Sequence, residues 1–209
     1  MLTKEAQAKI QLMVKKIGGI KLDVGAGDNI QEGFIGMDMR QTKNADIVHN
    51  AEVVPYPLPD EICHIIICSH LVEHLNPAKM IDIMNEWWRL LKETGQLWLS
   101  MPYAGSFGFW QDPTHIKTWN EATATYFDPS QFLYNIYKPK PYKIIRNVWH
   151  EGGNLEVVFE KLPESHEVHT PQGYDHIQIG ADKSKVKKIK SHTKRHGRAV
   201  TEMRGASLV

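Results

Sequence analysis

Apolar residues recur at helical spacing in two stretches of the chain. The first stripe, near the amino terminus, consists of Ala6, Ile10, Met13, Val14 and Ile17. Thr3 before it and Gly18 after it suit a helix N-cap and a helix stop, so the spacing predicts a helix over residues 3–16. The second stripe consists of Met80, Met84, Trp87, Trp88 and Leu91. It predicts a helix that starts at Asn76-Pro77, with Pro77 at the first helical position, and is stopped by Thr94-Gly95.

Short apolar runs between polar connections predict the strands. They lie at residues 20–24, 34–39, 46–49, 65–68 and 96–101, followed by a hairpin of residues 142–150 and 155–161 around the turn 151–154. The uninterrupted IIIC of residues 65–68 is typical of a parallel strand that is covered on both faces. We therefore predict an α/β, Rossmann-like, doubly wound and mostly parallel seven-stranded sheet with an antiparallel carboxy-terminal hairpin.

Charge is distributed unevenly along the 209 residues. Lys and Arg number 25 and Asp and Glu number 24. Residues 183–209 hold nine basic residues and one acid, a local charge of +8, which leaves −7 on residues 1–182. We expect residues 1–162 to form one domain and residues 163–209 to be a polar, then basic, poorly packed tail. That tail could bind nucleic acid, although a solvated segment is the simpler interpretation.

Several classes of protein are disfavoured by composition. No apolar run approaches the roughly 20 residues of a membrane helix, and the first residues lack a signal-peptide core, so we expect no membrane partner. Cys63 and Cys68 are the two cysteines, and their odd separation within one predicted strand excludes a local disulfide. A reducing, cytoplasmic setting is expected.

A glycine turn follows the first predicted strand, in LDVGAGDN of residues 22–29. Gly25-Ala26-Gly27 would let a ligand approach the backbone closely. A dinucleotide fingerprint would need a third glycine where Ile30 stands, and a full helix before the next strand. Only residues 28–33 are available for that helix, so an NAD-type site is disfavoured.

Polar residues stand at the ends of the next strands as well. Asp38 ends the second strand and could accept two hydrogen bonds from ribose hydroxyls, which suits an adenosine ligand without phosphates. Asn50-Ala51 follows the third strand, and Ser69-His70 follows the fourth. In a parallel sheet these carboxyl ends converge on one edge, where such folds bind ligands.

This ordered set resembles the class I S-adenosylmethionine-dependent methyltransferases, in particular a group of small methyltransferases. The matching stretches are LDVGAGDN, FIGMDM, ADIVHNAE, YPLPDEICHIIICSHLVEHL, GQLWLSMP and DPTHIKTWNEATATYF, within residues 20–161. His64 and Asn50 depart from the aspartates that are common in the family. The resemblance implies S-adenosylmethionine as cofactor and assigns the methionine end of the donor to Asp23, Gly25 and Gly27, with Ala26 between. It further assigns the binding of ribose and adenine to Asp38, Met39, Asn50 and Ala51. The floor of the donor site is assigned to Ser69 and His70.

The loop after the fifth strand carries the candidate catalytic residues His115, Tyr103 and Asp112. We expect an in-line displacement in which an oxygen or nitrogen nucleophile, more than a carbon, attacks the sulfonium methyl group. His115 is the candidate base, and no metal is expected. Equally, Asp112-Pro113 could simply form a turn. The acceptor is not specified by the sequence.

Two functions of other classes remain open. His70-Leu71-Val72-Glu73-His74 matches H-x-x-E-H, the signature of a zinc peptidase. Against this, His70 directly follows a strand, and Glu73 and His74 could simply cap a helix. The third possibility is a non-catalytic module that binds an adenosyl compound, with a basic tail for nucleic acid.

Overall fold

The computed structural model describes residues 2–165 of the chain. By its contacts the chain divides into two units, residues 1–174 and 175–209, and only the first contains described residues. The expected boundary at residue 162 stays a prediction, and the basic segment 183–209 lies outside the described residues.

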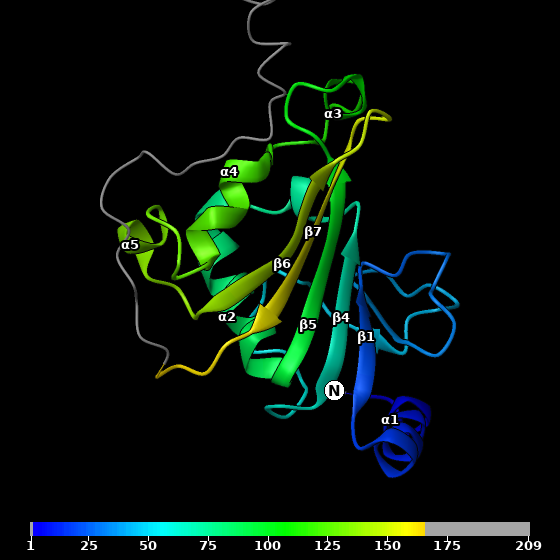
Figure 1. The fold of residues 1–209 in the computed structure, drawn as a ribbon. Coiled ribbons are helices and arrows are strands. Elements are labelled where there is room, and N and C mark those ends of the chain that lie inside the picture. Colours follow the sequence, from blue (N-terminus) through cyan, green and yellow to red (C-terminus); the bar gives the residue numbers. More distant parts are fainter. Residues whose placement is uncertain (1, 166–209) are drawn as a thin grey trace, which may run out of the picture. The chain divides into compact units, whose positions relative to one another are not determined.

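A seven-stranded sheet runs through the described unit (Figure 1). Its strands are β1 Ile20–Val24, β2 Ile35–Asp38, β3 Ile47–Val48, β4 Cys63–Ser69, β5 Leu91–Pro102, β6 Tyr142–Trp149 and β7 Asn154–Lys161. Their order is β3-β2-β1-β4-β5-β7-β6, parallel except for the pairs that β7 makes with β5 and β6. The predicted mostly parallel, seven-stranded α/β sheet and its antiparallel hairpin are confirmed.

The helices are short except for two. They are α1 Lys4–Ile17, α2 Met80–Leu90, α3 Phe107–Trp110, α4 Glu121–Ala124 and α5 Tyr134–Tyr137, with 3-10 turns η1 Val72–His74, η2 Pro77–Lys79 and η3 Thr125–Phe127. The predicted leading helix is confirmed: the Thr3 hydroxyl accepts from the Ala6 N–H, and Gly18 ends the helix with φ of 75°. None of the described helices is long and apolar enough to cross a membrane.

The predicted end of the second helix was wrong. The helix ends at Leu90, because Leu91 is already extended and pairs with Cys63 of β4. Thr94 and Gly95 therefore lie inside β5, where Thr94 has φ of 58° and bends the strand. The predicted start of this helix was also wrong, because Pro77–Lys79 form a 3-10 turn and the α-helix begins only at Met80.

One face of the sheet carries the core. Figure 1 shows α2, α4 and α5 gathered on one side of the sheet. The Tyr142 hydroxyl donates to the Met84 carbonyl of α2 at 2.7 Å, and the Phe127 ring of η3 meets Phe159 of β7 edge-on. Both cysteines are buried and free, as expected.

The other face has no helical cover over β4, β5 and β7 in the described part of the chain. Neither β1–β2 nor β2–β3 is connected by a described helix. A hollow of about 500 Å³ results, lined among others by Ile65, Ile67, Ser69, Trp98, Glu156 and Val158. Trp98 is 46% exposed there. The described sheet is therefore packed fully on one face only.

Candidate functional site

A cavity of about 300 Å³ lies at the carboxyl ends of β1 and β2. Five of the predicted donor-site residues line it together: Gly25, Asp38, Met39, Asn50 and Ala51. His49, Glu52, Leu71, His74 and Leu75 complete most of the wall. The convergence expected for the ends of parallel strands thus brings residues from four connections, those after β1, β2, β3 and β4, into one pocket.

The glycine turn forms the wall at the end of β1. Its backbone is tied to β2 by N–H bonds from Gly25 and Ala26 to the Met37 carbonyl, at 2.8 and 3.1 Å. Gly25 has φ of 80°, and a Cβ there would lie 2.9 Å from the Leu71 side chain. Only glycine allows this close packing, so the turn supplies backbone rather than side chains to the cavity.

Asp38 is held as a carboxylate at the end of β2. Its side chain accepts from the Gly27 N–H at 2.9 Å and from the Arg40 N–H at 2.8 Å, with the Arg40 guanidinium at 3.3 Å. Burial alone would raise the pKa of Asp38, but these hydrogen bonds and the nearby charge outweigh it and lower the pKa. A carboxylate has about four lone-pair positions, so acceptor capacity remains for a ribose hydroxyl.

Other predicted donor-site residues do not line this cavity. Asp23 accepts a hydrogen bond from the Gln31 N–H at 3.2 Å and so fastens the loop that follows the glycine turn. Burial raises the pKa of Asp23, against the lowering effect of that bond. Ser69 lies in the hollow on the open face of the sheet. His70 has φ of 52°, and its Nδ1 lies 3.4 Å from a Glu73 oxygen.

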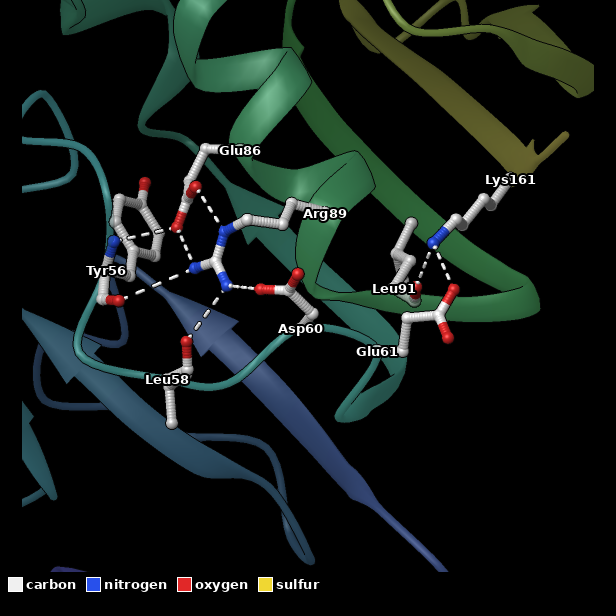
Figure 2. A network of polar contacts seen from close by, with 8 residues as sticks. All are labelled: Tyr56, Leu58, Asp60, Glu61, Glu86, Arg89, Leu91 and Lys161. Carbon is white, nitrogen blue, oxygen red and sulfur yellow. Dashed lines mark hydrogen bonds and ion pairs between the residues drawn. The ribbon is translucent and has the colours of Figure 1, made fainter. Parts of the chain in front are cut away.

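The segment that carries Asn50 and Ala51 is anchored to α2 (Figure 2). Buried Glu86 accepts from the Tyr56 N–H at 2.7 Å and from Nε of Arg89 at 2.8 Å. Arg89 also donates to the Leu58 carbonyl at 3.1 Å, and the Tyr56 hydroxyl donates to the Ala51 carbonyl at 2.9 Å. This chain of contacts holds the far wall of the cavity in place.

The same view shows a second anchor at the start of β5. Lys161 donates to the Leu91 carbonyl at 2.7 Å and to Glu61 at 3.0 Å (Figure 2). It also lies over the Trp88 ring, 4.0 Å from the centroid. The buried ammonium thus has three partners: a carbonyl, a carboxylate and an aromatic ring. Through Glu61 it connects β7 to the loop before β4.

Among the candidate catalytic residues, His115 is the one that faces other functional groups. Its side chain is 7% exposed, and its Nε2 lies 3.9 Å from a Glu73 oxygen and 3.9 Å from an Asp112 oxygen. Asp112 accepts from the Thr114 N–H and hydroxyl, at 2.8 and 2.7 Å, so it does form the alternative turn. The Tyr103 hydroxyl donates to Glu121 at 3.1 Å, within the same loop region.

The H-x-x-E-H motif does not have the geometry of a zinc peptidase. That chemistry needs its two histidines one turn apart on a helix. Here His70 lies directly after β4, outside any helix, and Val72–His74 is a 3-10 turn. The sequence did not indicate that Glu73 is fully buried, or that the His115 side chain lies 3.9 Å from it although the two residues are 42 positions apart.

Comparisons with known proteins agree with this geometry. A family model described as a methyltransferase domain matches residues 22–99, from β1 into β5. The chain is similar to a SAM-dependent methyltransferase from Archaeoglobus fulgidus, at 17% identity and a TM-score of 0.50, over 75% of this chain and 94% of that one. It is also similar to a SAM-dependent methyltransferase from Aquifex aeolicus, at 16% identity and a TM-score of 0.47, over 75% and 93%. No curated protein matches the chain.

The family model covers residues 22–99, and the Archaeoglobus protein shares the fold of this chain. Both findings agree with the expected class I methyltransferase. The match to a methyltransferase domain also supports an enzyme, and the Archaeoglobus and Aquifex proteins are the ones described as SAM-dependent.

Proposed function

We propose that the chain binds S-adenosylmethionine in the cavity at the ends of β1 and β2 and transfers its methyl group to an oxygen or nitrogen nucleophile. The observation that carries this proposal is the meeting of Gly25, Asp38, Met39, Asn50 and Ala51 around one cavity. Glycine backbone, a carboxylate held ionised and a polar amide are the groups that an adenosyl ligand without phosphates needs.

Each wall of the cavity has its own part in holding the donor. Asp38 binds a ribose hydroxyl through the lone-pair position that its three protein donors leave free. Met39 and Ala51 pack against adenine, while Asn50 hydrogen-bonds its edge. The turn of Gly25, Ala26 and Gly27 receives the methionine end. Asp23 supports the binding of the methionine end indirectly, because it accepts a hydrogen bond from the Gln31 N–H and so fixes the loop after the glycine turn.

The acceptor is bound under the loop that follows β5. When bound, S-adenosylmethionine supplies an activated methyl group, so the chain has to hold the acceptor in line and within about 3 to 3.5 Å of it. An acceptor hydroxyl or amine also has to lose a proton. Nε2 of His115 lies 3.9 Å from Oε1 of Glu73, and an imidazole nitrogen in this position can accept a proton or bind a cation. Asp112 and Tyr103 shape the loop around it.

Calorimetric titration with S-adenosylmethionine, S-adenosylhomocysteine and NAD tests the donor site. We expect micromolar binding of both adenosyl compounds and none of NAD. Asp38→Ala should weaken donor binding by about 1.5 to 3 kcal/mol, roughly 10- to 150-fold, because the ribose loses its acceptor. Asp82→Ala, on an exposed position of α2, is the matched control and should bind normally. Unchanged affinity in Asp38→Ala would place Asp38 outside the site.

A further inference from the structure

A buried carboxylate without hydrogen bonds lies beside the proposed donor cavity. Glu73, in η1, is fully buried, and neither of its side-chain oxygens has a hydrogen-bond partner. The nearest polar groups are Nδ1 of His70 at 3.4 Å and Nε2 of His115 at 3.9 Å, both measured to Oε1. Burying an ionised carboxylate without partners is costly, so such a group calls for a partner that the protein alone does not provide.

Two histidines present free nitrogens near this carboxylate. Nδ1 of His115 lies 2.7 Å from the Phe109 carbonyl. Nδ1 of His74 lies 3.3 Å from the Thr114 carbonyl and 3.0 Å from the Thr114 hydroxyl, which itself donates to Asp112. A carbonyl oxygen can only accept, so Nδ1 carries the hydrogen in both rings. In the neutral imidazoles Nε2 is then unprotonated. Histidines that bind metals are oriented in this way, with the other ring N–H donated to a carbonyl or carboxylate.

The backbone fixes these groups relative to one another. The Glu73 carbonyl accepts from the N–H groups of Ile116 and Lys117, at 2.8 and 3.0 Å. This pair of bonds clamps the loop after β5 onto η1, next to His115. The rings of His74 and His115 meet edge to face with centroids 4.7 Å apart. Backbone hydrogen bonds and the contact between the two rings therefore hold the three side chains in place.

We propose that Glu73, His74 and His115 bind a divalent transition-metal cation, with Zn²⁺ or Mn²⁺ as the favoured ions. One ligand atom from each residue lies within 4.8 Å of the others. Metal–ligand bonds of about 2.0 to 2.2 Å need these atoms about 1 Å closer, a change that side-chain rotation supplies. Two imidazoles and one carboxylate suit first-row transition metals better than Mg²⁺, which prefers oxygen ligands.

This site changes the expected chemistry in two ways. No metal was expected from the sequence, and His115 was the candidate base, whereas here it is a ligand. Three protein ligands leave coordination positions open. His74 also lines the donor cavity, so these positions adjoin the proposed methyl donor and favour acceptors that carry a hydroxyl. This consequence for the acceptor rests on the proposed function, whereas the cation site itself does not.

Cobalt binding to the full, untagged chain tests the proposal, because Co²⁺ bound by histidine and carboxylate has visible absorption bands. After treatment with a chelator, we expect one Co²⁺ per chain, displaced by Zn²⁺. Glu73→Gln and His115→Ala should each weaken Co²⁺ binding at least tenfold. His49→Ala, which removes another histidine from the cavity wall, should bind Co²⁺ like the unaltered chain.

Thermal unfolding separates ligand loss from misfolding. Zn²⁺ should raise the Tm of the unaltered chain and of His49→Ala, and should leave the Tm of His115→Ala unchanged. The inference is overturned if Co²⁺ does not bind, or if it binds equally well to Glu73→Gln and His115→Ala. Titration of the metal-free chain with S-adenosylmethionine keeps the two proposals apart, since donor binding without cation binding removes only the cation site.

Discussion

Two aspartates near the glycine turn illustrate how environment divides the roles of chemically equal side chains. Asp38 is surrounded by donors from Gly27 and Arg40, and its pKa is lowered. Asp23 is buried with one backbone donor, from Gln31, and its pKa is raised. The ionised form of Asp38 is thus stabilised by the fold, whereas that of Asp23 is a cost to the fold.

The lowered pKa of Asp38 predicts a pH dependence of stability. Its contribution is present above the unfolded-state pKa of about 3.9 and is lost as the pH falls through the lower folded-state value. We expect the difference in unfolding free energy between the unaltered chain and Asp38→Asn to be constant from pH 8 to 5 and to shrink below pH 4. Denaturant titrations across this range measure it. A difference that grows on acidification would contradict the assignment.

The raised pKa of Asp23 predicts the opposite sign. Stability from this group is present below the unfolded-state pKa and is lost as the pH rises through the folded-state pKa, so at pH 7 the charge is unfavourable. We expect Asp23→Asn, which keeps an acceptor for the Gln31 N–H, to be as stable as the unaltered chain or more stable at pH 7. If Asp23 serves the donor, the same variant should bind S-adenosylmethionine about tenfold more weakly. Loss of stability without loss of affinity would make Asp23 a purely structural residue.

At the scale of elements, α2 does more than cover the sheet. Its apolar stripe was predicted from spacing, but its polar residues Glu86 and Arg89 anchor the segment that carries Asn50 and Ala51. The pairing joins positions about 30 residues apart and depends on the tertiary fold. Periodicity cannot reveal such a contact, because it reports only which face of a helix is buried.

Removing Arg89 should therefore damage both the fold and the donor site. Arg89→Met leaves the Glu86 carboxylate buried without its main partner, and we expect a loss of about 3 kcal/mol of unfolding free energy. Donor affinity should fall as well, since the wall at Ala51 loses its support. In a double-mutant cycle, adding Glu86→Leu should restore part of the stability. Additive losses would show that the pair is not coupled.

A close approach between β2 and the following loop gives a second test at this scale. A Cβ on Gly36 would lie 2.2 Å from the Asn44 carbonyl oxygen and 2.9 Å from the Ile30 side chain. Backbone has to move to accept it, so Gly36→Ala should cost about 2 kcal/mol. Gly152, in the β6–β7 turn, has open space around it, and Gly152→Ala should change stability by less than about 0.5 kcal/mol. Equal melting temperatures for both variants would contradict this packing.

At the scale of the whole molecule, the strands and the fold class could be predicted from the sequence because buried strands and glycine turns are local signals. The order of the strands in the sheet was not predicted and came from the structure. The cavity was predictable as well, since parallel strands bring Asp38 and Asn50 to one edge. Two features could not be predicted: that the buried Glu73 oxygens have no hydrogen-bond partner, and that Ser69 lies on the open face of the sheet. Both depend on side-chain packing between distant segments. The end of α2 was misplaced because pairing of Leu91 with Cys63 overrode the stop signal at Gly95.

The uneven charge of the chain carries the last prediction. Residues 183–209 have a net charge of +8, against −7 for residues 1–182. If the basic segment binds nucleic acid, the full chain should bind single-stranded RNA with an affinity that falls steeply with salt, because each neutralised phosphate releases counterions. Replacing Lys183, Lys185, Lys187, Lys188 and Lys190 by Gln should weaken binding and flatten its salt dependence by about 0.7 log units per lost contact. Donor affinity, measured by calorimetry on the same variant, should be unchanged, because the donor cavity is built from residues 25–75. Fluorescence anisotropy at several salt concentrations gives the slope, and equal slopes for the two chains would exclude the segment as the binding site.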